Sequence, residues 1–212
     1  PPRVESFALK NGIKVLLVER HDLPVVSVRV ISKVGAGDVD AKPGAVAFFG
    51  SMLEQGTKSR SALQISDDYD ALGAQHGAGF DWDSGSANVR VPAAGLSPAL
   101  GILADVVLSP TFPDAEIERV RSRWLAGIAQ EKQSPQAMSG NAIAATLFGR
   151  GHPYGHSLTG EADDLKKVTR ADLVKLHAAL FAPSRLAIAV CGDVTRAQIA
   201  PGLEATFGAA KP

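Results

Sequence analysis

The chain has 212 residues of near-average apolar content, and its 22 lysines and arginines balance its 22 aspartates and glutamates. Balanced charge provides no global field that would attract nucleic acid or an acidic membrane surface, and the composition excludes the disordered and fibrous classes. Every apolar stretch is interrupted well before the ~20 residues that a membrane-spanning helix requires. The sequence therefore predicts a single globular domain over residues 1–212, with no membrane span and no nucleic-acid partner.

The N-terminal segment predicts a β-hairpin and a third strand. Residues 5–9 and 14–19 are strand-like and flank Asn11-Gly12, a dipeptide that favours a tight hairpin turn. β-Branched residues dominate 25–31, where their alternation indicates a strand with one buried face.

Helices and one strand are expected in the middle of the chain. Residues 45–53 are almost wholly apolar without strand-like alternation, which predicts a short buried helix that ends near Gly56. A second helix is expected over 61–72, and a strand over 80–91. Apolar residues at a helical period predict a further helix over 97–108.

Two longer helices are expected next, over 114–131 and 136–148, on either side of Pro135. Acidic residues near the start of the first one suit the positive end of the helix dipole. Thr169 is a candidate N-cap for another helix, which ends before Pro183.

The C-terminal segment predicts a strand over 186–191 and a last helix that ends near Phe207. Helices combined with hairpin-derived strands favour an α+β fold over a doubly wound one, which needs successive parallel strands. The expected architecture is a two-layer sandwich, in which helices pack on one face of a mainly antiparallel mixed sheet.

Cys191 is the single cysteine, so this chain alone can form neither an intrachain disulfide nor a cysteine-rich metal site. It follows the apolar run 186–190, which predicts a small buried apolar residue rather than a reactive thiol.

The histidines offer one alternative metal site. His152 and His156 are four residues apart, but Pro153 and Gly155 between them break the helix that this ligand spacing needs. We expect structural roles for both, and for the remaining histidines: His21, His76 and His177. Motifs of serine hydrolases, phosphate loops and dinucleotide sites are absent from the sequence.

Four local motifs carry a resemblance over essentially the whole chain. In chain order they are the hairpin Asn11-Gly12 with Val15-Leu16-Leu17, the block Gly44–Thr57 with Met52-Leu53 and Gly56-Thr57, the loop Gly151-His152-Pro153-Tyr154-Gly155 with Gly160, and the segment from Phe181-Ala182-Pro183 to Gly192-Asp193. Their order is similar to that of the insulinase/pitrilysin (processing-peptidase-like) family of zinc metallopeptidases. The resemblance implies the metallohydrolase-like α+β domain of that family.

Active members of that family carry an inverted zinc motif, H-x-x-E-H, on a helix. Residues four apart share one helical face, so both imidazoles reach one ion while the glutamate acts on the metal-bound water. The resemblance places these three side chains at Ala47, Gly50 and Ser51, and the glutamate that forms the third protein ligand at Gly127.

These four replacements imply a degenerate catalytic site. Alanine and glycine have no side-chain donor, and a serine hydroxyl is a poor zinc ligand compared with a neutral imidazole. The resemblance therefore implies no catalytic residue, no metal and no cofactor in this chain, in contrast to the zinc of active relatives. Glycine costs ~1 kcal/mol relative to alanine in a helix interior, so Gly50 and Gly127 also predict close packing at both positions.

The implied function is that of an inactive peptidase homologue. Family members enclose peptide between two halves, so a non-catalytic domain is expected to pair with an active homologous subunit or a second domain and to contribute peptide-binding surface. An edge strand can add a peptide strand by backbone hydrogen bonds without a metal. Two alternatives stay open: an active metallopeptidase with non-standard ligands, and a structural subunit like the degenerate relatives in respiratory cytochrome complexes.

The resemblance also implies a place in a longer protein. The chain ends just after Phe207-Gly208, where the first domain of the family ends, so we expect the N-terminal domain of a longer two-domain protein. A periplasmic or cell-envelope location is implied as well, and the start at Pro1-Pro2 is compatible with a removed export signal.

Overall fold

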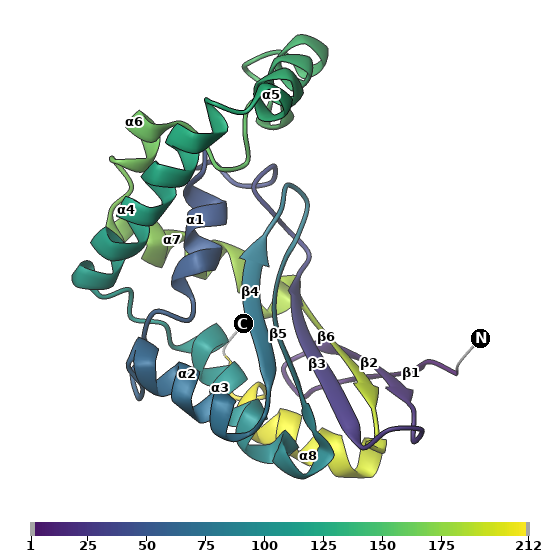
Figure 1. Ribbon diagram of the computed structural model, residues 1–212. Helices are drawn as coiled ribbons and strands as arrows, with labels where there is room; N and C mark the ends of the chain where they lie inside the picture. The colour runs from purple at the N-terminus through teal and green to yellow at the C-terminus, as the bar shows by residue number, and fades with distance from the viewer. Residues whose placement is uncertain (1–2, 211–212) are drawn as a thin grey trace.

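The computed structural model describes residues 3–210 as a six-stranded mixed sheet with helices packed on one of its faces (Figure 1). The strands are β1 (Glu5–Ala8), β2 (Lys14–Glu19), β3 (Val25–Ser32), β4 (Gln75–Phe80), β5 (Gly85–Pro92) and β6 (Leu186–Gly192). They lie in the order β1-β2-β6-β3-β5-β4, and each neighbouring pair is antiparallel except β2 and β6. The predicted α+β fold with a mainly antiparallel mixed sheet is confirmed.

The helices follow their predicted bounds closely, except α6 (Ala162–Leu165), which was not predicted. They are α1 (Ala45–Met52), α2 (Ala62–Ala71), α3 (Leu96–Leu108), α4 (Asp114–Glu131), α5 (Pro135–Phe148), α6 (Ala162–Leu165), α7 (Arg170–Leu180) and α8 (Arg196–Thr206), with 3-10 turns at Ala93–Gly95, Pro153–Gly155 and Pro183–Arg185. Thr169 is the N-cap that the sequence predicts, and it forms a reciprocal capping box with Asp172. Pro135, expected between two helices, is the first residue of α5. Among residues 3–210, no helix is both long and apolar enough to span a bilayer.

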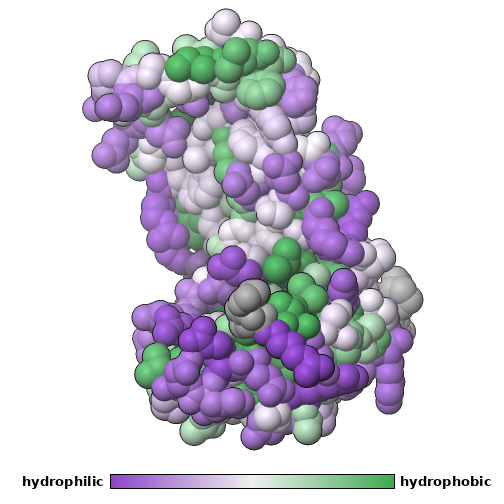
Figure 2. All heavy atoms as spheres, turned by 90° about the vertical axis from the view of Figure 1, so that its right-hand side faces the viewer, coloured by the Kyte–Doolittle hydropathy of each residue, from purple (hydrophilic) through white to green (hydrophobic). Residues whose placement is uncertain are grey.

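One face of the sheet forms the core. β3 alternates buried Val26, Val28 and Val30 with more exposed neighbours, and β6 repeats the pattern with Ile188 and Val190. Helices α1, α2 and α3 pack against the strands on the core side. The other side of the sheet is turned to the right in Figure 1 and to the viewer in Figure 2, where polar and apolar side chains are intermixed.

The prediction that Cys191 is buried is wrong. Cys191 lies on β6 as expected, but its side chain is exposed. Successive side chains of a strand point to opposite faces, so Ile188 and Val190 turn to the core and Cys191 to the open face. Alternate residues of the apolar run 186–190 therefore point to the core and to the open face of the sheet.

The strand predicted over 80–91 is confirmed from Gly85 onward as β5, but residues 81–84 form a turn and the preceding strand β4 was not predicted. β4 and β5 pair in antiparallel fashion through a tight turn, which is closed by a hydrogen bond from the Asp81 N–H to the Ser84 carbonyl (2.7 Å). β4 was not predicted because it contains Gly77 and Gly79, and glycine has little tendency to form strands. The missed strand lies at the edge of the sheet.

Candidate functional site

Helix α1 carries three of the four positions at which catalytic groups are expected. Its start is set by Gly44, whose φ of 82° is left-handed and where a Cβ would lie 2.4 Å from the carbonyl oxygen of Thr159. Phe48, Phe49 and Met52 bury another side of the helix in the core. α1 is therefore held between the core and the loop that contains Thr159.

Ala47 and Ser51 lie one helical turn apart on the half-buried side of α1. The Ser51 hydroxyl donates a hydrogen bond to the Ala47 carbonyl across 3.3 Å. Ala47 also lines a cavity of about 250 Å³, together with Trp82, Pro153 and His156 among others. The first predicted position thus opens into a cavity whose far walls come from the β4–β5 hairpin and the loop before α6.

Gly50 lies directly against the backbone of β4. A Cβ on Gly50 would stand 3.0 Å from the Gly79 Cα and 3.1 Å from the Phe80 nitrogen, closer than side chains normally approach. Backbone atoms cannot turn aside as a flexible side chain can, so a larger residue at position 50 would have to shift the β4 backbone by a few tenths of an ångström. The predicted close packing is confirmed at Gly50, and a glutamate there would need α1 and β4 to separate.

Gly127 lies on α4, which packs against α1. The Trp124 ring of α4 meets the Phe48 ring of α1 edge-on, with 5.7 Å between centroids, and Gly127 follows three residues later on the same side of the helix. A Cβ on Gly127 would have no atom from the rest of the fold within 4 Å. The prediction of close packing is therefore wrong at Gly127, and nothing in the structure explains a glycine there.

The side chains at these four positions do not fit a zinc ion. Ala47, Gly50 and Gly127 carry no donor atom, and the hydroxyl of Ser51 is bonded to the helix backbone. Across the part of the chain that the structure describes, residues 3–210, no group of three or more His, Cys, Asp or Glu is placed to hold a metal ion. The side chains at positions 47, 50, 51 and 127 therefore provide no set of zinc ligands.

The two loop histidines have separate environments. His152 Nδ1 accepts a hydrogen bond from the Tyr154 backbone N–H (3.1 Å), and its ring stacks on Phe148 with 5.5 Å between centroids. His156 instead meets Trp82 edge-on, at 5.5 Å. His152 thus has the structural role expected of it, whereas His156 faces the cavity beside Ala47.

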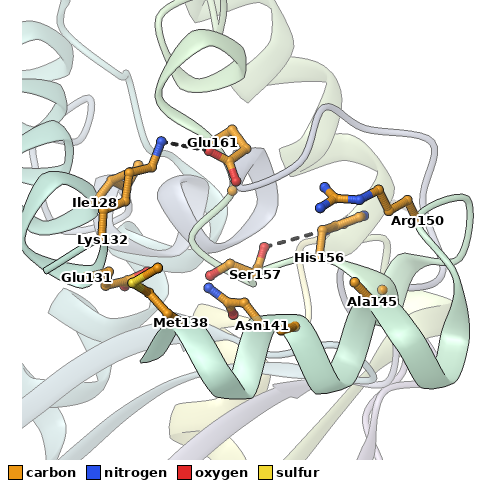
Figure 3. A pocket seen from close by; sticks show the side chains of 13 residues that line it. Ile128, Glu131, Lys132, Met138, Asn141, Ala145, Arg150, His156, Ser157 and Glu161 are labelled. Atoms are coloured by element: carbon orange, nitrogen blue, oxygen red, sulfur yellow. Dashed lines mark hydrogen bonds and ion pairs between the residues drawn. The ribbon is translucent and has the colours of Figure 1, made fainter. Parts of the chain in front are cut away.

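A second cavity, of about 240 Å³, lies between α4, α5 and the loop before α6 (Figure 3). Its walls include Ile128, Lys132, Met138, Asn141, Arg150 and Glu161. Lys132 and Glu161 form an ion pair of 3.2 Å at its rim. Because His156 lines this cavity as well as the one beside Ala47, the two cavities are neighbours.

β4 presents an open edge next to α1. Antiparallel pairs alternate between hydrogen-bonded and non-bonded positions, so the bond from Asp81 to Ser84 directs the backbone groups of His76 and Ala78 away from β5. Within residues 3–210 no strand lies beyond β4, and Gly50 of α1 meets the strand at Gly79 and Phe80. Such an edge is suited to the addition of a peptide strand.

Two further histidines are held by hydrogen bonds within the fold. His76 Nδ1 lies 2.9 Å from Glu54 Oε1, and its ring stacks on Tyr69 with 4.2 Å between centroids. His177 Nε2 donates to the Val107 carbonyl at 2.7 Å, and burial lowers the pKa of its imidazole. Both therefore have the structural roles that the sequence predicts.

Comparison with known proteins decides the family. The sequence profile described as insulinase (peptidase family M16) matches residues 14–161. The chain belongs to this family. It is 28% identical over 201 residues to an uncharacterized zinc protease of Mycobacterium leprae, covering 94% of this chain and 45% of that protein. It is 25% identical over 199 residues to human mitochondrial cytochrome b-c1 complex subunit 1, and the match covers 93% of this chain and 41% of that protein. The chain thus spans less than half the length of these M16 relatives.

Solved structures share the fold. A structure from Pseudomonas fluorescens, described as a peptidase M16 inactive domain, superposes with a TM-score of 0.92 at 32% identity, over 99% of this chain and 51% of that one. The first half of the periplasmic protease PqqL from Escherichia coli superposes with a TM-score of 0.87 at 17% identity, over 100% of this chain and 47% of that one. This chain covers 24% of the whole PqqL chain, so a PqqL protein is about four times its length.

Proposed function

We propose that this M16 chain is a non-catalytic domain that pairs with an active homologous subunit and contributes peptide-binding surface to a proteolytic chamber. The observation that carries the proposal is the close approach of Gly50 to β4, because a side chain at this position, where the resemblance expects the catalytic glutamate, would have to displace the β4 backbone by a few tenths of an ångström. The companion positions Ala47, Ser51 and Gly127 supply no imidazole or carboxylate. The description of the Pseudomonas fluorescens neighbour as an inactive domain supports the same view.

Peptide binding without catalysis is supported by the position of β4. Its free backbone groups at His76 and Ala78 offer the hydrogen bonds that an added strand needs. The strand leads toward Trp82, which lines the cavity beside Ala47. A peptide strand added to β4 would therefore approach that cavity without any metal contact.

Pairing is supported by the size of the relatives. The chain covers 45% of the Mycobacterium leprae protein and 51% of the Pseudomonas fluorescens chain, and we infer that residues 1–212 form the single N-terminal domain of a longer two-domain protein. The periplasmic description of PqqL supports a periplasmic or cell-envelope location.

Two other functions have support from individual relatives. Similarity to cytochrome b-c1 complex subunit 1 favours a structural role, which predicts that the protein co-purifies with an electron-transfer complex. The zinc-protease name of the Mycobacterium leprae relative favours an active enzyme with non-standard ligands. That alternative predicts stoichiometric zinc in the purified protein and peptide cleavage that a chelator blocks. The proposed function predicts neither.

Reconstitution from separately purified full-length proteins tests the proposal. The protein is mixed with an M16 homologue from the same organism that has an intact H-x-x-E-H motif, and hydrolysis of fluorogenic peptides is followed. We expect the mixture to hydrolyse the peptides faster than the homologue alone does. This protein alone should show no hydrolysis that a chelator stops. A mixture no faster than the homologue would contradict pairing.

A homologue with its motif glutamate replaced by glutamine is the matched control. The mixture of this protein with the variant should show no peptide hydrolysis if all catalysis resides in the homologue. Chelator-sensitive turnover that persists in the control mixture would locate catalysis in this chain and would overturn the proposal.

A further inference from the structure

α5 is a helix without a buried side. None of its 14 residues is buried, and residues 135–149 include no charged side chain. It carries four of the eight large apolar side chains that are exposed within residues 3–210: Met138, Ile143, Leu147 and Phe148. The apolar surface at the top of Figure 2 lies over this part of the molecule. An exposed apolar cluster of this kind marks an interaction surface.

The contacts that hold α5 lie at its two ends. Ser134 caps the start by accepting a hydrogen bond from the Ala137 N–H (3.4 Å), and Phe148 at the other end stacks on His152. Between these ends, the second cavity separates the inner side of α5 from α4 (Figure 3). Helices of this length are marginal in water without packing, so a surface that covers α5 would stabilise it.

Ile143 and Leu147 form the outer side of α5. They are four residues apart and therefore share one side of the helix, whereas Met138 and Asn141 line the cavity from another side (Figure 3). Leu147 is 73% exposed. Because this side is apolar and uncharged, a surface that covers it must itself be apolar, since an unpaired charge buried there would be costly.

α5 stands beside the degenerate site. His156 lines both the cavity under α5 and the cavity beside Ala47, and Figure 1 places α5 at the same end of the molecule as α1 and α4. A subunit that closes over α1 to enclose a peptide therefore meets α5.

We propose that the outer side of α5, centred on Ile143 and Leu147, is the docking surface for the active homologous subunit. The inference rests on the proposed function, because that subunit is the one that closes over the α1 site. The remaining half of the same polypeptide is the competing occupant, and the position of α5 beside the Ala47 cavity favours the enclosing subunit over it.

Ile143→Glu combined with Leu147→Glu tests the surface in the full-length protein. By calorimetry with the active homologue, we expect the double variant to bind at least about tenfold more weakly than the wild type, as for loss of buried apolar anchors. Leu63→Glu is the matched control, because Leu63 is 69% exposed and its helix, α2, lies at the opposite end of the molecule (Figure 1).

The outcomes separate this inference from the proposed function. Binding by the double variant that equals that of the wild type, with Leu63→Glu also unchanged, would overturn the docking surface alone. No association between the wild-type protein and the homologue would overturn the proposed function and this inference with it.

Cysteine labelling decides which occupant covers α5. In full-length protein carrying Cys191→Ser, Leu147→Cys provides a thiol on the outer side of α5, and Leu63→Cys provides a control thiol on α2. We expect Leu147→Cys to react rapidly with a maleimide in the protein alone and to be protected by the homologue, while Leu63→Cys stays reactive. Protection before the homologue is added would assign α5 to the protein's own remaining half and overturn the proposal.

Discussion

Gly50 of α1 and Gly79 of β4 meet with no side chain between them, since a Cβ on Gly50 would lie 3.0 Å from the Gly79 Cα. The contact joins α1, the helix on which the resemblance places the zinc motif of active relatives, to β4, the edge strand of the sheet. Position 50, where the resemblance expects the catalytic glutamate, therefore carries no side chain and is closely packed against β4.

The two helical glycines are expected to respond in opposite ways to the same substitution. Gly50→Glu overpacks α1 against the β4 backbone, which costs about 1–3 kcal/mol of unfolding free energy. Gly127→Glu enters open space and replaces a poor helix former, a gain of about 0.5–1 kcal/mol. Urea unfolding of the two single variants measures both effects. Equal stabilities for the two variants would be incompatible with the contact described above.

A zinc site without activity is expected from Ala47→His, Ser51→His and Gly127→Glu together. The three side chains supply the zinc ligands that the resemblance expects at these positions, while Gly50 keeps its contact with β4. Calorimetric titration with zinc measures the affinity, and the variant with only the two histidines is the matched control and should bind more weakly. A folded triple variant that binds zinc no better than this control would show that the positions are misaligned.

Peptide binding at β4 is expected to be lost in Ala78→Pro without loss of the sheet. The substitution removes an N–H that points away from β5, and edge strands tolerate proline at such positions. Gly77→Pro is the contrasting control, because its N–H faces β5 and its loss should destabilise the hairpin. Fluorescence polarisation with a labelled peptide, together with circular dichroism, measures both properties. Undiminished peptide affinity in folded Ala78→Pro would rule out strand addition at this edge.

His177 is expected to make the fold less stable in mild acid. Burial lowers the pKa of its imidazole, so as the pH falls the unfolded chain binds the proton first. The free energy of unfolding therefore decreases from about pH 6.5 down toward the folded-state pKa. In His177→Gln the free energy of unfolding should fall less steeply with decreasing pH on this acid limb of its pH profile. Urea unfolding between about pH 5 and pH 7.5 measures it.

His21 is the control with the opposite sign. Its hydrogen bond with Asp193 (2.6 Å) raises the pKa of the imidazole, so its contribution to stability is present below the unfolded-state pKa and is lost as the pH rises through the folded-state value. His21→Gln should therefore leave the acid limb at least as steep. An acid limb in His177→Gln that is parallel to that of the wild type would contradict the assignment to His177.

Local sequence features were sufficient for most of the fold. Asn11-Gly12 produces the predicted hairpin with Gly12 at a φ of 87°, and Thr169 caps α7 through its side chain. These elements depend on residues close in sequence, so their boundaries can be predicted without tertiary information.

The features that escaped prediction depend on contacts between distant segments. β4 carries two glycines and acquires strand geometry only by pairing with β5. The different surroundings of Gly50 and Gly127 follow from how α1 and α4 meet the sheet and each other, which helix propensity does not specify. Cys191 shows the same limit, because an apolar run cannot reveal which strand face the helices cover.

Zinc content and peptide hydrolysis of the purified full-length protein, measured without any partner, test most directly whether this chain is catalytic. After expression in zinc-replete medium, we expect no tightly bound zinc and no hydrolysis that a chelator stops, because Ala47, Gly50, Ser51 and Gly127 provide neither ligands nor a general base. Stoichiometric zinc together with chelator-sensitive cleavage by the isolated protein would contradict this expectation.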